Sequence, residues 1–103
     1  MNVYISGPVS GIENYEENFR SISEIVKSRG LTPISVLDFS VLKLDSFKWS
    51  DCMKICISML EHCDCVLMLD GWRLSVGATI EKAWATKMGM PVYYSVDELF
   101  HSL

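Results

Sequence analysis

Basic residues are few in this chain, and long apolar runs are missing. Its 103 residues include 9 Lys and Arg against 13 Asp and Glu, a formal net charge of -4. The basic residues are scattered, whereas a nucleic-acid-binding face needs clustered Lys and Arg, so we expect no nucleic-acid polymer as a partner. No apolar run approaches the roughly 20 residues of a membrane span, and the opening MNVYIS lacks the basic start of a signal peptide. We therefore expect a cytoplasmic protein with no membrane association.

Paired C-x-x-C spacings are missing as well. The four cysteines stand at positions 52, 56, 63 and 65, and structural zinc sites usually show paired spacings with a loop between them. We expect reduced, buried thiols and no metal site. Half of the residues are hydrophobic and 21% are charged, which suits one compact domain over residues 1–103. The sequence shows no repeat, linker or low-complexity segment.

Short apolar runs alternate with segments of helical periodicity. The runs VYIS, LTPISV, CVLMLD and VYYS predict strands, and the segments between and after them predict helices. The stretch from Phe39 to Trp49 is expected to be a loop with a short helical turn. This alternation predicts the α/β class: a single Rossmann-like (flavodoxin-like) three-layer domain with a four- to five-stranded parallel sheet. Val3–Ser6 and Cys65–Leu69 are expected to be adjacent central strands, and Pro33 favours an edge strand.

Helix ends carry recognisable signals. Asn14, Ser50, Ser75 and Ser95 each precede a helical segment and are predicted N-caps. Gly30 is expected to end the first helix.

Two polar segments follow predicted strands. Ligands of such sheets bind at the carboxyl ends of the strands, where SGPVSG and the stretch from Asp70 to Ser75 both lie. Gly7 and Gly11 would let backbone N–H groups approach a ligand, although an ordinary tight turn is the alternative. Ser75 and Gly77 open a helix whose free N–H groups favour a phosphate, and a plain N-cap is compatible with that role.

Glu81 is the one acid in the helix that follows. We expect the helix N-terminus to favour its ionised form, and an ionised carboxylate near a sugar is a possible nucleophile. The alternative is a solvated surface glutamate. Tyr4 and Trp72 could stack on a base, with core packing as the alternative. Asp64 begins a strand, lies at the opposite edge of the sheet and is expected to be structural.

Four segments together carry a family resemblance. YISGPVSGIENY, WSDC, CDCVLMLDGW and SVGATIEKAWA resemble the nucleoside 2-deoxyribosyltransferase-like superfamily, and most closely a small branch of unknown function from phages and bacteria. The resemblance implies a small Rossmann-like fold and cleavage or exchange of the N-glycosidic bond of a deoxyribonucleoside or its 5′-monophosphate. By its motif, Glu81 is the implied nucleophile. No metal or organic cofactor is implied.

The chain departs from that superfamily at one important position. Eight residues before Asp64 stands Cys56, where the superfamily usually has an aspartate that binds the sugar and assists the leaving base. Asp51, in the first turn of the same helix, is the candidate replacement. Ser75 stands where the monophosphate hydrolases have a serine beside the phosphate. Arg20 and Arg73 are the candidate further phosphate ligands, because Pro8 and Ser10 replace stronger donors in the first loop.

The sequence therefore predicts an N-glycosidase or deoxyribosyltransferase-like enzyme with two sets of site residues. The catalytic candidates are Glu81, Asp70 and Asp51. The substrate-binding candidates are Tyr4, Ser6, Gly7, Gly11, Trp72, Ser75 and Gly77. Cys56 leaves open a nucleotide-binding or sensing module with impaired catalysis, and a purely structural or interaction protein is the third possibility. A domain with few strands has apolar helix faces to cover, so we expect a homodimer or higher homo-oligomer.

Overall fold

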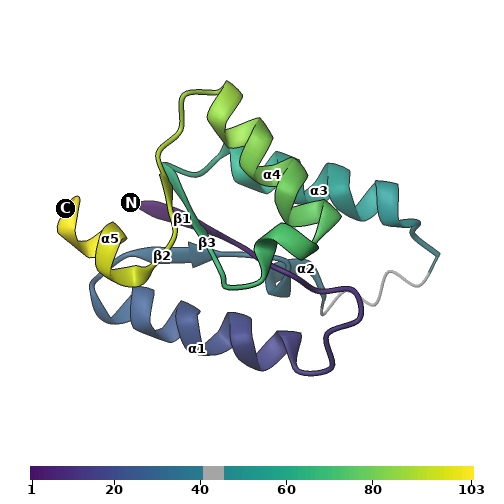
Figure 1. Cartoon of the computed structure of the whole chain (residues 1–103), viewed down its shortest axis with the longest axis horizontal. Helices are drawn as coiled ribbons and strands as arrows, with labels where there is room; N and C mark the ends of the chain where they lie inside the picture. Colours follow the sequence, from purple (N-terminus) through teal and green to yellow (C-terminus); the bar gives the residue numbers. More distant parts are fainter. Residues whose placement is uncertain (41–45) are drawn as a thin grey trace.

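A computed structural model describes residues 1–40 and 46–103 of the chain (Figure 1). The elements in chain order are β1 (Asn2–Ser6), α1 (Tyr15–Ser28), β2 (Thr32–Ile34), α2 (Leu37–Ser40), α3 (Trp49–Glu61), β3 (Cys65–Met68), the 3-10 helix η1 (Trp72–Leu74), α4 (Val76–Lys87), β4 (Val92–Tyr93) and α5 (Val96–His101). The expected loop from Phe39 to Trp49 begins in α2, and its residues 41–45 lie outside the described residues. None of the helices in the described part of the chain has the length and apolar character needed to cross a bilayer.

All four strands run parallel in one sheet, in the order β2-β1-β3-β4. The expected α/β class and the central position of β1 and β3 are confirmed, with Tyr4 opposite Val66 and Ser6 opposite Met68. Pro33 lies on the edge strand β2, as expected. A proline is tolerated there because one side of an edge strand has no neighbouring strand, so the missing N–H costs no hydrogen bond.

The two faces of the sheet are covered by different helices, which gives three layers (Figure 1). Successive side chains of a strand point to opposite faces. Val3 and Ile5 therefore belong to the buried cluster that also contains residues of α1 and α5. Tyr4 belongs to the opposite cluster, with residues of α3 and α4. This alternation directs Tyr4 and Ser6 together toward α4.

The edge strands are shorter than the sequence suggests, and just beyond each of them a carboxylate accepts a hydrogen bond from a backbone N–H. The N–H of Ser35 donates to Asp38 Oδ2 at 2.7 Å, which turns the chain into α2. The N–H of Tyr94 donates to Glu98 Oε2 at 2.8 Å, just before α5. Each bond satisfies a backbone N–H that points away from the neighbouring strand and stabilises the turn into the next helix.

Two of the four predicted N-caps are confirmed, and two are wrong. Ser75 and Ser95 each accept the expected backbone hydrogen bond, both at 3.1 Å. The side chain of Asn14 makes no cap bond, and its backbone, with ψ of 33°, is not in the extended conformation of an N-cap. Ser50 lies inside α3, since the helix already begins at Trp49 and the extended residue before it is Lys48. Gly30 follows the end of α1 with a φ of 78°, as expected of a helix terminator.

Candidate active site

Glu81 is a buried carboxylate held by two hydroxyl groups. It lies in the second turn of α4, and only 6% of its surface is exposed, so it is not a solvated surface residue. Tyr4 and Ser6 both point at it, because they are two residues apart on the same face of β1. The Tyr4 hydroxyl donates to Oε2 at 2.5 Å, and the Ser6 hydroxyl donates to Oε1 at 2.6 Å. Each carboxylate oxygen therefore has its own donor.

Burial decides the protonation behaviour of this group. Desolvation raises the pKa of Glu81 above its usual range, and hydrogen bonds from Ser6, Tyr4 and Cys56 oppose that rise without cancelling it. The expectation that the helix N-terminus favours ionisation is therefore corrected. The helix dipole acts mainly on the first turn, and Glu81 lies beyond it. Burial, and then the charge of Glu81, raises the pKa of Tyr4, so that its phenol stays protonated and donates.

Cys56 reaches the same centre from α3. It is buried, and it lies close enough to Tyr4 and Glu81 for its sulfur to interact with both. Desolvation by burial raises the pKa of the Cys56 thiol to about 12, which keeps the thiol neutral. Cys56, which stands where the resemblance implies an aspartate, therefore lies next to Glu81.

A cavity of about 670 Å³ opens in front of Glu81. This volume is in the range of pockets that hold small molecules. Its walls come from the end of β1, the following loop, α1, α3 and the start of α4, and the lining residues include Tyr4, Gly7, Ser10, Tyr15, Trp49, Cys56, Ser75, Gly77 and Glu81. Among the residues that the structure describes, the site therefore combines an apolar wall with a few hydroxyl groups and one carboxylate.

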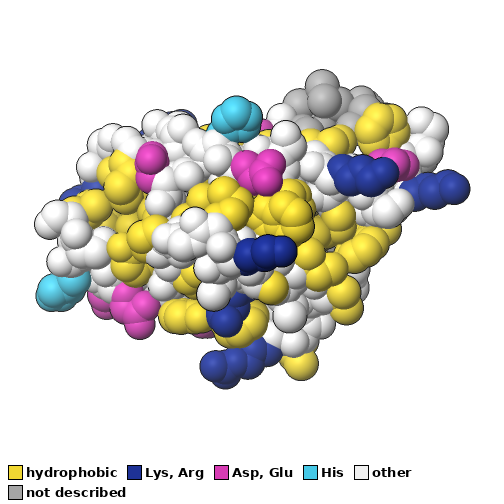
Figure 2. Space-filling view, turned by 90° about the horizontal axis from the view of Figure 1, so that it is seen from above, with side chains coloured by type: hydrophobic (Ala, Val, Ile, Leu, Met, Phe, Trp, Pro, Cys, Tyr) yellow, Lys and Arg dark blue, Asp and Glu magenta, His cyan; other side chains and the backbone are white. Residues whose placement is uncertain are grey.

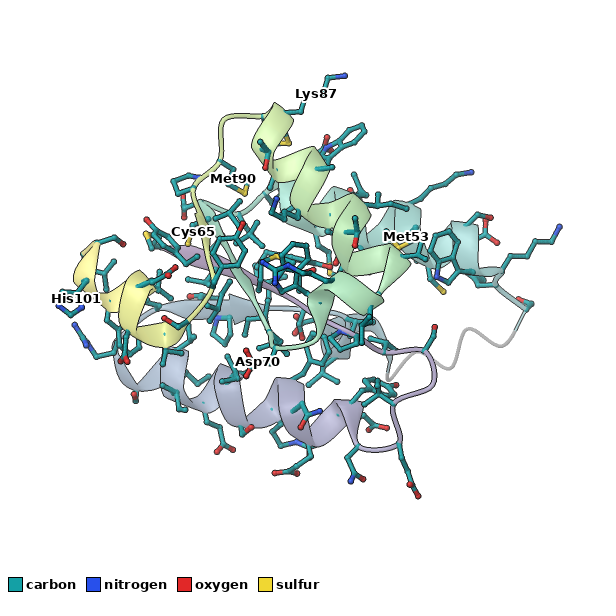
Figure 3. The ribbon with its side chains drawn as sticks, viewed as in Figure 1. Met53, Cys65, Asp70, Lys87, Met90 and His101 are labelled. Atoms are coloured by element: carbon teal, nitrogen blue, oxygen red, sulfur yellow. The ribbon has the colours of Figure 1, made fainter. Side chains whose placement is uncertain are left out.

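Two glycines keep the cavity walls close together. A Cβ at Gly7 would lie 2.8 Å from Leu69 Cβ, and a Cβ at Gly77 would lie 3.2 Å from Met53 Sδ. Met53 projects between α3 and α4 (Figure 3). Small residues at both positions allow the β1 loop to approach β3 and the start of α4 to approach α3.

Five predicted site residues share the cavity wall. They are Tyr4, Gly7, Ser75, Gly77 and Glu81. Ser6 lies outside the lining and reaches the site through its bond to Glu81. The Ser75 hydroxyl accepts from Ala78 N at 3.1 Å, so the N-cap role expected for this residue is present at the cavity wall.

The other catalytic candidates and Trp72 lie outside the cavity. Asp51 accepts from Lys48 N at 2.9 Å and completes the start of α3. Asp70 is exposed on the loop after β3 (Figure 3). The ring of Trp72 packs against Tyr94, with centroids 5.8 Å apart. A catalytic or binding role for these residues stays a prediction.

The other residues singled out in the sequence are either exposed or bound to a local partner. Gly11 is exposed, with a φ of 77° and no neighbour that a Cβ would meet. Arg20 pairs with Glu17 at 3.2 Å, and Arg73 lies over the Trp72 ring at 5.1 Å. Neither arginine lines the cavity. At the opposite edge of the sheet, Asp64 accepts from Asn2 N at 2.7 Å, a structural contact of the kind expected for it.

Several residues of the cavity wall are not among the site residues predicted from the sequence. Tyr15 and Phe19 from α1, and Trp49 and Met53 from α3, line the wall. Apolar residues at helical spacing predict core packing equally well, so periodicity alone could not separate them from the core. Two of the four stand in segments that carry the family resemblance: Tyr15 ends YISGPVSGIENY, and Trp49 begins WSDC.

Comparison with known proteins agrees with this fold. Residues 1–94 match the model of the family described as domain of unknown function (DUF4406). The chain belongs to this family. A solved structure named 2-desoxiribosyltransferase from Leishmania mexicana aligns with a TM-score of 0.67 and 19% sequence identity, over 88% of this chain. The structural likeness shows a shared fold, and the alignment covers 61% of the length of that protein. None of the curated proteins matches the chain.

Proposed function

We propose that this DUF4406 protein cleaves or exchanges the N-glycosidic bond of a deoxyribonucleoside or its 5′-monophosphate, with Glu81 as the nucleophile. The observation that carries the proposal is a buried carboxylate on a cavity wall, fixed by Tyr4 and Ser6. Carboxylates act as covalent nucleophiles at sugar carbons when they are ionised and held in place. The fold shared with a 2-desoxiribosyltransferase supports the same chemistry.

The proposed reaction has two displacements. In the first, an oxygen of ionised Glu81 bonds to the anomeric carbon of the sugar, and the carbon–nitrogen bond breaks. The electron pair of that bond goes to the departing base, which takes a proton from water. In the second, water or another base attacks the same carbon and loses a proton to the hydroxide left by the first step, and the bond to Glu81 breaks to release the carboxylate. Neither displacement requires a metal or an organic cofactor.

The start of α4 is the proposed position of the 5′ end of the substrate. Ser75 and Gly77 lie on the cavity wall at the start of α4, with Gly77 one turn before Glu81. The N–H of Ala78 donates to Ser75 Oγ, and the N–H groups before it have no partner within the helix. A phosphate or a 5′-hydroxyl bound there would bring the sugar toward Glu81. The base would then face the apolar wall formed by residues such as Tyr15 and Trp49.

Turnover and binding assays on one set of ligands test the proposal. The protein is incubated with the common deoxynucleosides and their 5′-monophosphates, and the free base is measured by chromatography. Thermal unfolding is recorded with the same ligands. We expect release of free base, with water or with an added second base as acceptor. Folded protein that releases no base from any of these substrates contradicts the proposal.

The second candidate function is a nucleotide-binding module without turnover. The observation that favours it is Cys56, a neutral thiol at the position where the resemblance implies an aspartate. A thiol is a weak donor and a weak acceptor, so it assists a leaving base poorly. A ligand-dependent rise in unfolding temperature without release of base would support this candidate.

We also propose that the chain forms a homodimer or a higher homo-oligomer through the outer face of α4. Val76, Ile80, Trp84 and Met88 follow at intervals of four residues, and all are exposed. Leu74, next to this row and 93% exposed, lines the mouth of the cavity. Seen from above, hydrophobic side chains gather at the centre of the face formed by α3 and α4 (Figure 2). Self-association would remove this apolar surface from water and cover the cavity mouth.

Two matched isoleucine variants test the oligomer. Ile80 on α4 is 39% exposed and Ile25 on α1 is 42% exposed, on opposite sides of the sheet. We expect Ile80→Glu to lower the molar mass measured by sedimentation equilibrium to that of one chain, and Ile25→Glu to leave it unchanged. A wild-type protein that sediments as a single chain at high micromolar concentration contradicts the proposed oligomer.

A further inference from the structure

Ser6 is held rigidly at the end of β1. Only 1% of its surface is exposed, and its carbonyl accepts from Leu69 N at 2.8 Å, which ties the end of β1 to the end of β3. The next residue, Gly7, has no room for a Cβ against Leu69. The backbone at Ser6 therefore has little freedom, and its hydroxyl is directed at Glu81 Oε1 from a fixed position.

The two hydroxyl groups together fix the plane of the carboxylate. The terminal torsion of a glutamate is broad, so one hydrogen bond would leave the group free to rotate. Tyr4 binds Oε2 and Ser6 binds Oε1, and both donors come from one rigid strand. Two fixed points remove that rotation. An oriented carboxylate does not have to be ordered again when a substrate arrives.

Ser6 has this contact with Glu81 without forming part of the cavity wall. The lining includes Tyr4, Gly7 and Glu81 but not Ser6. A ligand in the cavity would therefore meet Glu81 and would not meet the Ser6 hydroxyl. This position differs from the substrate-binding role that the sequence suggests for Ser6.

We infer that Ser6 is a positioning residue, which orients the Glu81 carboxylate and favours its ionised form through the bond to Oε1. The role in turnover rests on the proposed function, whereas the effect on Glu81 itself does not. A hydrogen bond from a neutral hydroxyl to a carboxylate favours the charged form. It opposes the desolvation that raises the pKa of Glu81, in the same direction as the bond from Tyr4.

A direct test is titration of the Glu81 carboxyl carbon by NMR in the free protein. Three variants are compared with the wild type: Ser6→Ala, Ser6→Cys and Ser35→Ala. Ser35 is the matched control, since it is equally buried and its hydroxyl accepts from Leu37 N at 3.2 Å, away from Glu81. We expect the titration midpoint of Glu81 to move to higher pH in Ser6→Ala and to stay in place in Ser35→Ala. It should move less in Ser6→Cys than in Ser6→Ala, because a thiol is a weaker donor than a hydroxyl but still a donor. An unchanged midpoint in folded Ser6→Ala overturns the inference; if that variant does not fold, Ser6→Cys is judged by the same criterion.

Turnover provides a second measurement. If Glu81 must be ionised, the acidic limb of the kcat profile should move to higher pH in Ser6→Ala, with a loss of about 10-fold on that limb. A loss that is the same at every pH would mean that Ser6 does not keep Glu81 ionised. A wild type with no turnover would contradict the proposed function and would leave the NMR titration to decide the role of Ser6.

Discussion

The phenol of Tyr4 donates a hydrogen bond of 2.5 Å to Oε2 of Glu81, across a separation of 77 residues in the sequence. A parallel sheet produces this contact, because the central strand β1 and the helix after β3 meet above the same edge. The contact places a donor on a buried acid, and the acid faces a cavity. Changes at the acid and at the start of α4 should therefore have separable effects on turnover and on binding.

Glu81→Gln should remove turnover and keep ligand binding. The amide has nearly the same size as the carboxylate but is a poor nucleophile, so we expect kcat to fall by about 10³-fold or more. The dissociation constant of a nucleoside should change little, because the nucleophile acts on the scissile bond. Calorimetric titration and base release measure the two effects. The exposed Glu24 on α1 supplies the control, Glu24→Gln, and full turnover in Glu81→Gln would exclude Glu81 as the nucleophile.

Ser75→Asp should separate phosphate binding from nucleoside binding. Aspartate caps a helix about as well as serine, so α4 should keep its N-cap while its first turn gains a negative charge. That charge repels a 5′-phosphate, and we expect monophosphate affinity to fall by about 10-fold or more with nucleoside affinity nearly unchanged. Ser95→Asp is the matched control, because Ser95 caps α5 with a hydrogen bond of the same length and lies outside the cavity. Equal monophosphate affinity in wild type and Ser75→Asp would place the phosphate elsewhere.

The two central strands can be predicted from the sequence, whereas the lengths of the two edge strands cannot. The runs Val3–Ser6 and Cys65–Leu69 are short, largely apolar and without charged residues, which indicates strands covered on both sides, and β1 and β3 are such strands. The turns that follow β2 and β4 are held by single contacts in which Asp38 and Glu98 accept from backbone N–H groups. No periodicity encodes such contacts.

The candidate site is readable only in part, for a similar reason. Strand alternation and the predicted helix start at Ser75 are enough to place Tyr4, Ser75 and Glu81 on one edge of the sheet. The proximity of Cys56 to Glu81 depends on how α3 packs against α4, a long-range relationship that local sequence does not contain. The burial that raises the pKa of Glu81 likewise depends on long-range packing, which local sequence does not contain.

Cys56→Asp should raise turnover if the missing acid limits the reaction. Recovery of one acid or orienting contact is worth about 10²-fold. The new carboxylate would lie beside Glu81, and two like charges raise each other's pKa. We therefore expect the gain in turnover mainly at higher pH, where Glu81 is ionised despite the new neighbour. Cys56→Ser, which adds a hydroxyl without an acid, is the control. Equal kcat for the wild type, Cys56→Ser and Cys56→Asp would show that this position does not limit the reaction.

The raised pKa of Glu81 predicts a specific dependence of stability on pH. In the unfolded chain a glutamate has a pKa of about 4.3, whereas burial raises the pKa of Glu81 in the folded protein and keeps it protonated to higher pH. Between these two values the folded state binds more protons than the unfolded state, so the free energy of unfolding falls as pH rises. Glu81→Gln removes this contribution.

The measurement is urea unfolding of both proteins over a series of pH values. The wild type should lose stability relative to Glu81→Gln as pH rises from the unfolded pKa through the folded pKa, and the difference should level off above it. Taking the difference removes the contributions of the other carboxylates, and Glu24→Gln should follow the wild type throughout. A constant difference between the wild type and Glu81→Gln would mean that Glu81 titrates alike in the folded and unfolded chain. Burial would then not control the charge of the group on which the proposed chemistry depends.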